Sequence, residues 1–320
     1  MGESFSPLST ETRMFIAGHC GLVGAALWRH FTKRGFTNLI GRTSAELDLR
    51  DARRTADFFA ETRPEMVINA AALVGGIAAN ALRPADFLSD NLRIQVNLLD
   101  SAVANGVERF LFLASSCIYP KLADQPIRED ALLTGPLEET NEGFAMAKLA
   151  GVKHVEAIRR QHGLPYISIM PTSLYGPGDN FSIAGSHVLP AMIRRFHEAA
   201  RDGAGEITCW GTGRPRREFL YVDDLADACH FLLENYNDDA AINVGIGEDV
   251  SIADLAALIA DIVGYRGEIH WDHDKPDGTY RKVLDVTRMH DLGWSAKTSL
   301  SEGIRATYAW FAGNQDSYRA

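Results

Sequence analysis

Short apolar runs alternate with longer helical patterns along the first half of the chain, and this alternation restricts the possible folds more than any other feature. Strand-like runs are predicted at 14–17, 38–40, 66–72, 109–114 and 166–170. Long helices are predicted between them, among others over 90–105 and 145–161. Alternating strands and helices are typical of a doubly wound parallel sheet. We therefore predict an α/β protein with a Rossmann-type fold.

The sequence pattern changes after residue 180. Glycine, proline and charged residues become more frequent, and the strand-like runs shorten to EITCWG, INVGIG and EIHWD. We expect a flexible leader over 1–13, a dinucleotide-binding Rossmann domain over 14–180, and a smaller C-terminal α/β lobe over 181–320. This lobe should supply mainly substrate contacts, while some later segments return to the first domain.

Charge and composition exclude several classes of partner. The chain has 320 residues and a formal net charge of −10, which argues against nucleic acid and anionic membranes as general partners. Its longest uncharged run, 66–82, is interrupted by asparagines and glycines and does not resemble a membrane span. The four cysteines show no CxxC spacing, and the first residues lack a basic and apolar signal segment. Both observations favour a reducing, cytoplasmic location.

A glycine-rich turn follows the first predicted strand, in the stretch MFIAGHCGLVGAAL. Gly18, Gly21 and Gly24 form a GxxGxxG pattern that opens a helix. Glycines at such a turn let the backbone approach a pyrophosphate, which then lies at the helix N-terminus. The same pattern also occurs in ordinary tight turns, but its position after the first strand favours dinucleotide binding.

The choice of cofactor depends on the residues after the second strand. An acidic residue there would favour NAD through the ribose hydroxyl. Gly41 and Arg42 occupy the place instead, so Arg42 could bind the 2′-phosphate of NADP, or it could be a solvated surface arginine. Asp48 could contact the adenine or cap the following helix. We expect NADP(H), with NAD(H) kept as an alternative.

Several long motifs follow in order: VGGIAAN, SSCIYPKLADQPI, NEGFAMAK, PTSLYGPGDNF, SHVLPAMIRRFHEA, WGTGRPRREFLYVDD and KPDGTYRKVLDVTR. With the glycine turn, they make the chain similar to the GDP-L-fucose synthase family of extended short-chain dehydrogenases/reductases. The resemblance extends from about residue 14 to residue 312. It implies a GDP-4-keto-6-deoxy-mannose-type substrate that is inverted at carbons 3 and 5 and reduced at carbon 4 with NADPH. It also implies a homodimer formed by the helices over 90–105 and 145–161.

The resemblance assigns catalytic roles to individual residues. Cys117 and His187 are the acid/base pair of the epimerisation, Ser115 binds the carbon-4 oxygen, and Lys148 binds the nicotinamide ribose. Thiols and imidazoles have ordinary pKa values of roughly 8.5 and 6.5, close enough to neutrality for the two groups to exchange roles.

The resemblance also implies two sets of binding residues. The cofactor would contact Gly18, Gly21, Leu22, Val23, Gly24, Arg42, Asp48, Ala70, Ala71, Lys148, Pro171, Leu174 and His187. The GDP moiety would contact Arg195, Trp210, Arg217 and Asp277. The stretch WDHDKPD contains several metal-ligating residue types, but adjacent residues of a strand point to opposite faces. We therefore expect no metal site.

Phe144 is the main departure from the family, because it stands where the proton-donating tyrosine is expected. Phe144 and Lys148 are four residues apart and share one helix face. A phenyl ring has no proton to give to the alkoxide formed at carbon 4, so we expect the reduction to be impaired. Cys20 and Ser44 stand where arginines often face the cofactor phosphate, which weakens the preference for NADP.

Three hypotheses follow. In the first, Phe144 is an introduced substitution for tyrosine in an otherwise intact reductase. In the second, Phe144 is native, and the chain epimerises a 4-keto sugar nucleotide and leaves the reduction to another enzyme. The third hypothesis is a non-catalytic nucleotide-binding protein, against which the retained Ser115, Cys117, Lys148 and His187 argue. The sugar also stays open, because fucose, dideoxy-sugar and heptose precursors present a similar 4-keto group.

Overall fold

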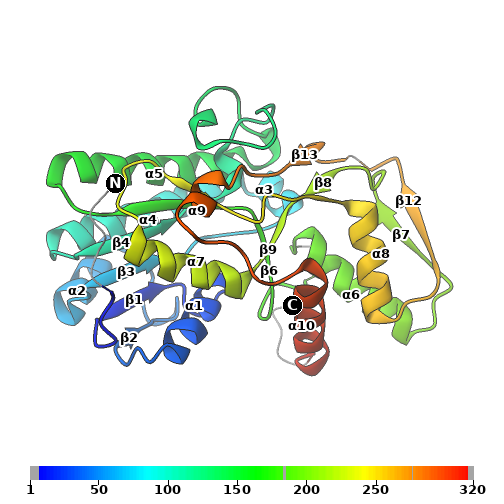
Figure 1. Ribbon diagram of the computed structural model, residues 1–320, viewed down its shortest axis with the longest axis horizontal. Coiled ribbons are helices and arrows are strands. Elements are labelled where there is room, and N and C mark those ends of the chain that lie inside the picture. Colours follow the sequence, from blue (N-terminus) through cyan, green and yellow to red (C-terminus); the bar gives the residue numbers. More distant parts are fainter. Residues whose placement is uncertain (1–6, 183–184, 276, 316–320) are drawn as a thin grey trace.

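The computed structural model describes residues 7–182, 185–275 and 277–315, and it contains a parallel sheet at its centre (Figure 1). Six strands form this sheet in the order β10-β5-β4-β3-β1-β2, and all neighbouring pairs are parallel. They are β1 (Met14–Ala17), β2 (Leu39–Ile40), β3 (Met66–Asn69), β4 (Arg109–Leu113), β5 (Ile167–Pro171) and β10 (Ile242–Val244). The Rossmann-type fold is confirmed.

Helices cover both faces of this sheet (Figure 1). On one face α4 (Pro84–Ala104) packs against α5 (Glu142–His162), with α2 (Ala52–Thr62) beside α4. On the other face α1 (Leu22–Lys33) packs against α7 (Val222–Asn235). The central strands are buried on both faces, which explains why they appear as continuous apolar runs in the sequence.

The first strand shows how the sheet divides the core. Met14 and Ile16 pack with residues of α1 and α7, whereas Phe15 packs on the opposite face, where its ring centroid lies 4.8 Å from that of Phe58 on α2. Successive side chains of a strand point to opposite faces, so one short run supplies both layers of the core.

A smaller lobe lies beside the sheet, on the right in Figure 1. One short sheet contains β11 (Val250–Ser251), β8 (Arg216–Arg217) and β13 (Arg281–Lys282) in that order. A second sheet pairs β7 (Glu206–Trp210) with β12 (Glu268–Asp272), and a third pairs β6 (Ser173–Tyr175) with β9 (Phe219–Tyr221). Two helices, α6 (Val188–Arg201) and α10 (Leu300–Gly313), pack with α8 (Ile252–Val263). Phe181, Phe196 and Phe311 belong to the apolar core of this lobe.

Short elements complete the described chain. These are α3 (Ile77–Leu82), α9 (Thr287–Asp291) and the 3₁₀ turns η1 (Ser116–Ile118), η2 (Glu129–Ala131) and η3 (Glu139–Asn141). The segment INVGIG does not belong to the second lobe, because its residues form β10 and pair with β5 of the central sheet. The chain therefore returns to the first domain, and α7 does so as well.

The structure describes part of the predicted leader, from residue 7 onwards. Residues 1–6 lie outside the described residues. The backbone N–H of Leu8 donates to Glu234 over 2.9 Å, Thr37 donates to the carbonyl of Thr10, and Arg13 donates to Glu65. Leu8, Thr10 and Arg13 are therefore hydrogen-bonded to the folded body, and the flexible leader over 1–13 stays a prediction.

A pair of histidines joins α1 to α7. Nε2 of His30 lies 3.0 Å from Nδ1 of His230, and the two rings meet edge to face. Burial lowers the pKa of both imidazoles, and that of His30 falls to about 4, partly because His230 is its neighbour. Charged groups around the pair are Arg34, Asp223, Asp227 and Glu234. The folded protein therefore favours the neutral form of both rings.

We expect the free energy of unfolding to decrease as the pH falls from about 6.5 towards 4, because the unfolded chain then takes up protons that the folded chain rejects. At pH 5 the contribution of His30 to this loss should be roughly 1 to 2 kcal/mol. Urea denaturation at pH 7.5 and pH 5 should show a smaller loss for His30→Gln than for the unsubstituted protein. The exposed His273 provides the control, since His273→Gln should keep the full loss. Equal losses in all three proteins would contradict the prediction.

Candidate active site

The glycine turn lies where the strand order reverses, between β1 and β3. Gly18 has a φ of +80°, a left-handed conformation that favours glycine, and a Cβ there would lie 2.8 Å from backbone atoms of Ala71. A Cβ on Gly24 would lie 2.1 Å from the carbonyl oxygen of Gly18. The turn therefore packs directly on the Ala70–Ala71 segment that follows β3. Parallel sheets bind ligands at such a reversal, beyond the carboxyl ends of the strands.

The start of α1 offers backbone donors at the same place. Gly21 is the N-cap of α1 and donates its N–H to Gly18 over 2.9 Å, and the helix begins with Leu22 and Val23. The first turn of α1 has no acidic side chain. Its free N–H groups and the helix dipole can therefore attract a phosphate.

Arg42 lies next to the glycine turn through a contact between two loops. A Cβ on Gly41 would lie 2.6 Å from the ring of His19, which is part of the turn. The Arg42 guanidinium is exposed, donates to the carbonyl of Gly41 over 2.8 Å, and lies 5.6 Å from the ring centroid of Phe58. An exposed cation thus stands at the cofactor end of the sheet.

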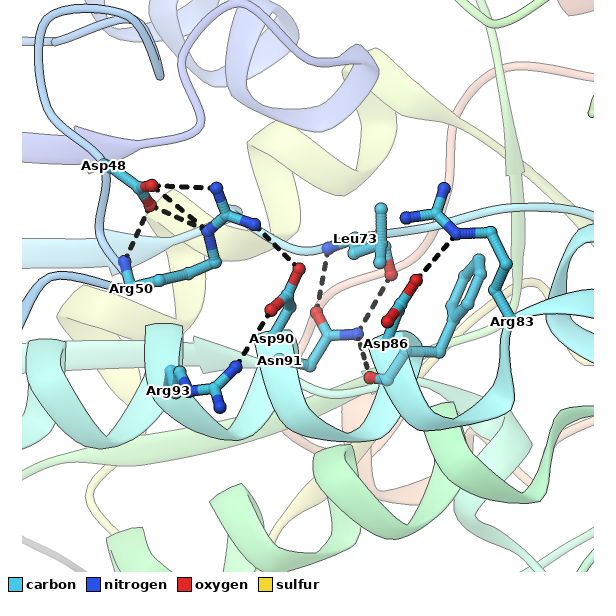
Figure 2. A network of polar contacts seen from close by, with 9 residues as sticks. Asp48, Arg50, Leu73, Arg83, Asp86, Asp90, Asn91 and Arg93 are labelled. Atoms are coloured by element: carbon cyan, nitrogen blue, oxygen red, sulfur yellow. Dashed lines mark hydrogen bonds and ion pairs between the residues drawn. The ribbon is translucent and has the colours of Figure 1, made fainter.

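The Asp48 carboxylate accepts hydrogen bonds from the Arg50 side chain and does not cap a helix. Figure 2 shows Arg50 donating to both carboxylate oxygens of Asp48 and, over 2.9 Å, to Asp90 on α4. The hydrogen bonds from the Arg50 side chain lower the pKa of Asp48 to about 2. Asp48 does not cap the following helix, because Asp51 accepts the N–H of Arg54 over 3.0 Å and is the N-cap of α2. The adenine contact remains a proposal.

The loop after β3 is fastened to α4 in the same region (Figure 2). The Asn91 side chain accepts the N–H of Leu73 over 2.8 Å and donates to the Leu73 carbonyl over 3.0 Å. Further along this loop, Gly76 donates its N–H to the carbonyl of Gly185 over 3.2 Å. The loop therefore connects the central sheet with the segment that precedes α6.

His187 is the N-cap of α6, directly after that segment. Its surface remains accessible to solvent, yet the surrounding protein lowers its pKa by desolvation. No hydrogen bond joins His187 to Cys117 in the described part of the chain. The acid/base pair of Cys117 and His187 stays a prediction.

Ser115 and Cys117 lie beyond the carboxyl end of β4. Ser115 caps η1 and accepts the N–H of Cys117 over 3.2 Å. The thiol of Cys117 is partly exposed. Because the Ser115 hydroxyl accepts in this contact, its own proton is available for another acceptor.

Phe144 and Lys148 reach the same strand end from α5. Nζ of Lys148 donates to the carbonyl of Leu113 over 2.8 Å and lies 5.0 Å and 6.0 Å from the ring centroids of Phe112 and Phe144. Lys148 is 5% exposed, and its burial lowers its pKa to about 8. Since α5 also packs against η1, the structure brings Lys148 together with Ser115 and Cys117.

Arg217 is brought to this group from the second lobe. It lies at the end of β8, and burial lowers its pKa, while the nearby Asp277, Cys117 and Glu138 act in the opposite direction. Asp277 accepts the N–H and the hydroxyl of Thr212 over 2.9 and 2.7 Å, so it shapes the turn before β8. Cys117 is therefore among the groups whose charge acts on the predicted GDP-binding residue Arg217.

The other predicted residues are more dispersed. Arg195 on α6 donates to the carbonyl of Thr208 on β7, and Trp210 is 68% exposed at the end of β7. Pro171 is buried at the end of β5, beside β10, and Leu174 lies in β6 against the core. Among the described residues, no group of three or more His, Cys, Asp or Glu is placed to hold a metal ion.

One buried acid escaped the sequence analysis. Glu218 is 1% exposed, and its carboxylate accepts backbone N–H groups from distant segments. The stretch GRPRREF appears in the sequence as a basic surface patch, and strand alternation would place Glu218 on the face opposite to the apolar Phe219, so the sequence carried no signal for a buried acid.

Comparisons with known proteins agree with this geometry. The model of the "NAD dependent epimerase/dehydratase family" matches residues 14–245. "GDP-L-fucose synthase 1" of Arabidopsis thaliana is 53% identical over 315 residues, which cover 98% of each chain. "GDP-L-fucose synthase" of Escherichia coli (strain K12) is 50% identical, over 97% of this chain and 99% of the relative.

Solved structures give the same result. A GDP-L-fucose synthetase from Naegleria fowleri bound to NADP superposes with a TM-score of 0.92 at 28% identity, covering 100% of this chain and 98% of that one. A GDP-6-OMe-4-keto-L-xylo-heptose reductase from C. jejuni gives a TM-score of 0.91 at 34% identity, covering 96% and 99%. The chain therefore belongs to the NAD-dependent epimerase/dehydratase family and, within it, to the GDP-L-fucose synthase family. The resemblance predicted from the motifs is confirmed.

No helix among the described residues is both long enough and apolar enough to cross a membrane.

The buried Lys148 should lower the stability of the protein. Its ammonium holds a proton less tightly in the folded than in the unfolded chain. The free energy of unfolding therefore decreases as the pH falls from about 10.5 to about 8, and the full loss is present below pH 8. We expect Lys148→Met to raise the free energy of unfolding at pH 7 by roughly 1 to 2 kcal/mol, after the loss of the hydrogen bond to Leu113 is subtracted. The gain should shrink as the pH rises towards 10.

Urea denaturation at pH 7 and pH 9.5 measures this effect. Lys153→Met, at an exposed position of the same helix, is the matched control and should change the free energy of unfolding by less than about 0.5 kcal/mol. A Lys148→Met protein that is less stable than the unsubstituted one at pH 7 would show that the ammonium is not destabilising.

Proposed function

We propose that the protein inverts carbons 3 and 5 of a GDP-4-keto-6-deoxy-mannose-type sugar nucleotide and reduces carbon 4 with NADPH, forming GDP-L-fucose or a close analogue. One observation carries the proposal: Ser115, Cys117 and Lys148 gather beyond the end of β4, with Arg217 of the second lobe near the thiol. The 53% identity to a curated GDP-L-fucose synthase over nearly the full chain supports it.

The residues around the glycine turn suit NADP(H). Because Gly18 and Gly24 have no Cβ, the turn can pack closely against the neighbouring backbone. The N–H donors at the start of α1 would hold the pyrophosphate. Arg42 would face the 2′-phosphate, which offsets Cys20 and Ser44, and Asp48 would face the adenine. Lys148 would bind the nicotinamide ribose, next to Pro171 and Leu174. When bound, NADPH supplies the hydride for carbon 4, and NAD(H) is the alternative cofactor.

The epimerisation needs a base, an acid and a stabilised enolate. The ketone at carbon 4 acidifies the protons on carbons 3 and 5, and Cys117 and His187 remove and return them from different sides. Desolvation lowers the pKa of His187, which favours the neutral ring that accepts a proton. The available hydroxyl proton of Ser115 binds the carbon-4 oxygen and stabilises its negative charge.

Phe144 slows the reduction because it offers no proton at the carbon-4 oxygen. It is 9% exposed and packs near Lys148, so the ring fills the position without supplying a polar atom. The Lys148 ammonium still stabilises negative charge in a desolvated site. This observation favours a second candidate function, an epimerase that releases the keto sugar to another enzyme. A non-catalytic binding protein remains the third hypothesis.

The GDP moiety would lie against the second lobe. Arg217 and Arg195 carry the charge that a diphosphate requires, and guanidinium groups bind phosphate oxygens through paired hydrogen bonds. Trp210 offers an exposed apolar face, with Nζ of Lys275 5.9 Å from its ring centroid. Asp277 orders the turn beside them.

We also propose that the protein acts as a homodimer in the cytoplasm. The outer surfaces of α4 and α5 carry the exposed apolar side chains of Val96 and Met146, which a second copy could cover. The partly exposed thiol of Cys117 has to stay reduced to exchange protons, which suits a reducing compartment.

The proposal is tested with GDP-4-keto-6-deoxy-mannose in heavy water, with and without NADPH, followed by mass spectrometry. We expect two deuterons to enter the sugar at a measurable rate, and NADPH oxidation to be much slower than the exchange. Cys117→Ser should abolish most of the exchange while leaving NADPH affinity unchanged. Nucleotide binding without any exchange would support the binding protein instead.

Restoring the phenol should restore the reduction. A preorganised donor at a developing oxyanion is typically worth about 10²- to 10³-fold in rate, so Phe144→Tyr should accelerate NADPH oxidation by that factor. Phe144→Leu keeps an apolar side chain and serves as the matched control without gain. If Phe144→Tyr gave no acceleration, the missing phenol would not be what limits the reduction.

A further inference from the structure

A carboxylate without solvent contact connects the two parts of the molecule. Glu218 is 1% exposed and lies between β8 and β9 in the chain. Its Oε1 accepts the N–H groups of Ile246 and Gly247 over 2.6 and 2.8 Å, and its Oε2 accepts the N–H of Leu284 over 2.8 Å. Three amide donors thus compensate a charge that burial would otherwise disfavour.

The partners of Glu218 belong to different layers of the fold. Ile246 and Gly247 follow β10 of the central sheet, whereas Leu284 follows β13 of the second lobe. The backbone carbonyl of Glu218 also accepts the hydroxyl of Thr172, directly after β5, over 3.3 Å. One residue therefore fixes where the second lobe stands relative to the carboxyl ends of β5 and β10.

Neighbouring residues pack closely around the Glu218 side chain and also bind its backbone. A Cβ on Gly245 would lie 2.1 Å from Oε1 of Glu218, so the carboxylate occupies the space of the missing side chain. The N–H of Glu218 donates to the carbonyl of Lys282 over 3.2 Å. Both the side chain and the backbone of Glu218 are hydrogen-bonded. Glu218 therefore sets the direction of the side chain of the residue before it.

That preceding residue is Arg217. Successive residues of a strand point to opposite faces, so holding Glu218 inward turns Arg217 the other way. Arg217 accordingly lies beside Cys117, Asp277 and Glu138. Arg216, by contrast, is bound to Asp249 within the lobe.

We propose that Glu218 is a positioning residue that holds the Arg217 guanidinium where it binds the diphosphate of the nucleotide-sugar substrate. The proposal rests on the proposed function, in which Arg217 contacts GDP. Glu218 itself does not touch the substrate. It acts by joining the β10 loop, the β13 loop and β8 into one rigid support.

A double-mutant cycle on GDP binding tests this dependence. GDP and NADPH affinities would be measured by titration calorimetry for the unsubstituted protein, Glu218→Gln, Arg217→Gln and the double variant. Glutamine keeps the size of the side chain but places an N–H₂ group against an amide donor, so one of the bound loops must move. Arg217→Gln removes the cation that a diphosphate requires.

We expect Arg217→Gln to weaken GDP binding on the order of 10- to 100-fold, as for other hydrogen bonds to charged groups. Glu218→Gln should weaken it about 10-fold, and the double variant should bind no worse than Arg217→Gln alone. Affinity for NADPH should stay unchanged throughout. A residue with a merely structural role would give additive losses and would weaken both ligands.

The outcomes separate the two proposals. If Arg217→Gln left GDP binding intact, the assignment of Arg217 in the proposed function would fail, and the positioning role with it. If Arg217→Gln weakened GDP binding but Glu218→Gln did not, or if the losses added, the positioning role alone would be overturned. The exposed Glu248, in the same loop as Gly247, gives the matched control Glu248→Gln with unchanged affinity.

A second variant covers the case in which Glu218→Gln does not fold. Thr172→Val keeps the shape of the side chain and removes only the hydroxyl that binds the Glu218 carbonyl. It should weaken GDP binding about 2- to 3-fold in the presence of Arg217 and not at all in the Arg217→Gln protein. An equal loss in both backgrounds would overturn the proposal.

Discussion

The burial of the central strands on both faces governs where polar chemistry can occur in this protein. All four residues of β1 are at most 1% exposed, and such strands leave little room for unpaired polar side chains along their length. The groups of the site therefore gather beyond the strand ends: Gly18 after β1, Ala70 after β3 and Ser115 after β4. The reversal of strand order between β1 and β3 separates the connections on either side and provides space for a dinucleotide.

Lys148 shows how the chemistry of the site conflicts with stability. Its ammonium is enclosed between the rings of Phe112 and Phe144 and donates to the carbonyl of Leu113. Desolvation makes the charge costly for folding and, for the same reason, effective in stabilising an oxyanion. Phe144 fills its place in this arrangement with an apolar ring that is 9% exposed and offers no proton to a ligand.

Two neighbouring arginines of the second lobe, Arg216 and Arg217, have different partners. Arg216 is bound to Asp249, whose side chain is 3% exposed, while Arg217 faces Cys117 and Asp277 from the opposite side of the strand. The sequence shows only a basic stretch, in which the two arginines are equivalent. Strand alternation could have assigned them to opposite faces, but it could not say which face meets the substrate, because that depends on how β8 is placed against the central sheet.

The alternation of strands and helices, the glycine turn and, through the long motifs, the family can all be inferred from the order of residues alone. These are local patterns, and the steric limits of a glycine or the period of a strand act over a few residues. That INVGIG joins the central sheet and that Glu218 is buried could not be read from local patterns. Both outcomes depend on partners far away in the chain, whose position is set by the burial of apolar surface over the whole molecule. The cap of α2 by Asp51 rather than Asp48 is a local contact with Arg54, but both aspartates are residue types that can cap a helix, so the sequence left the choice open.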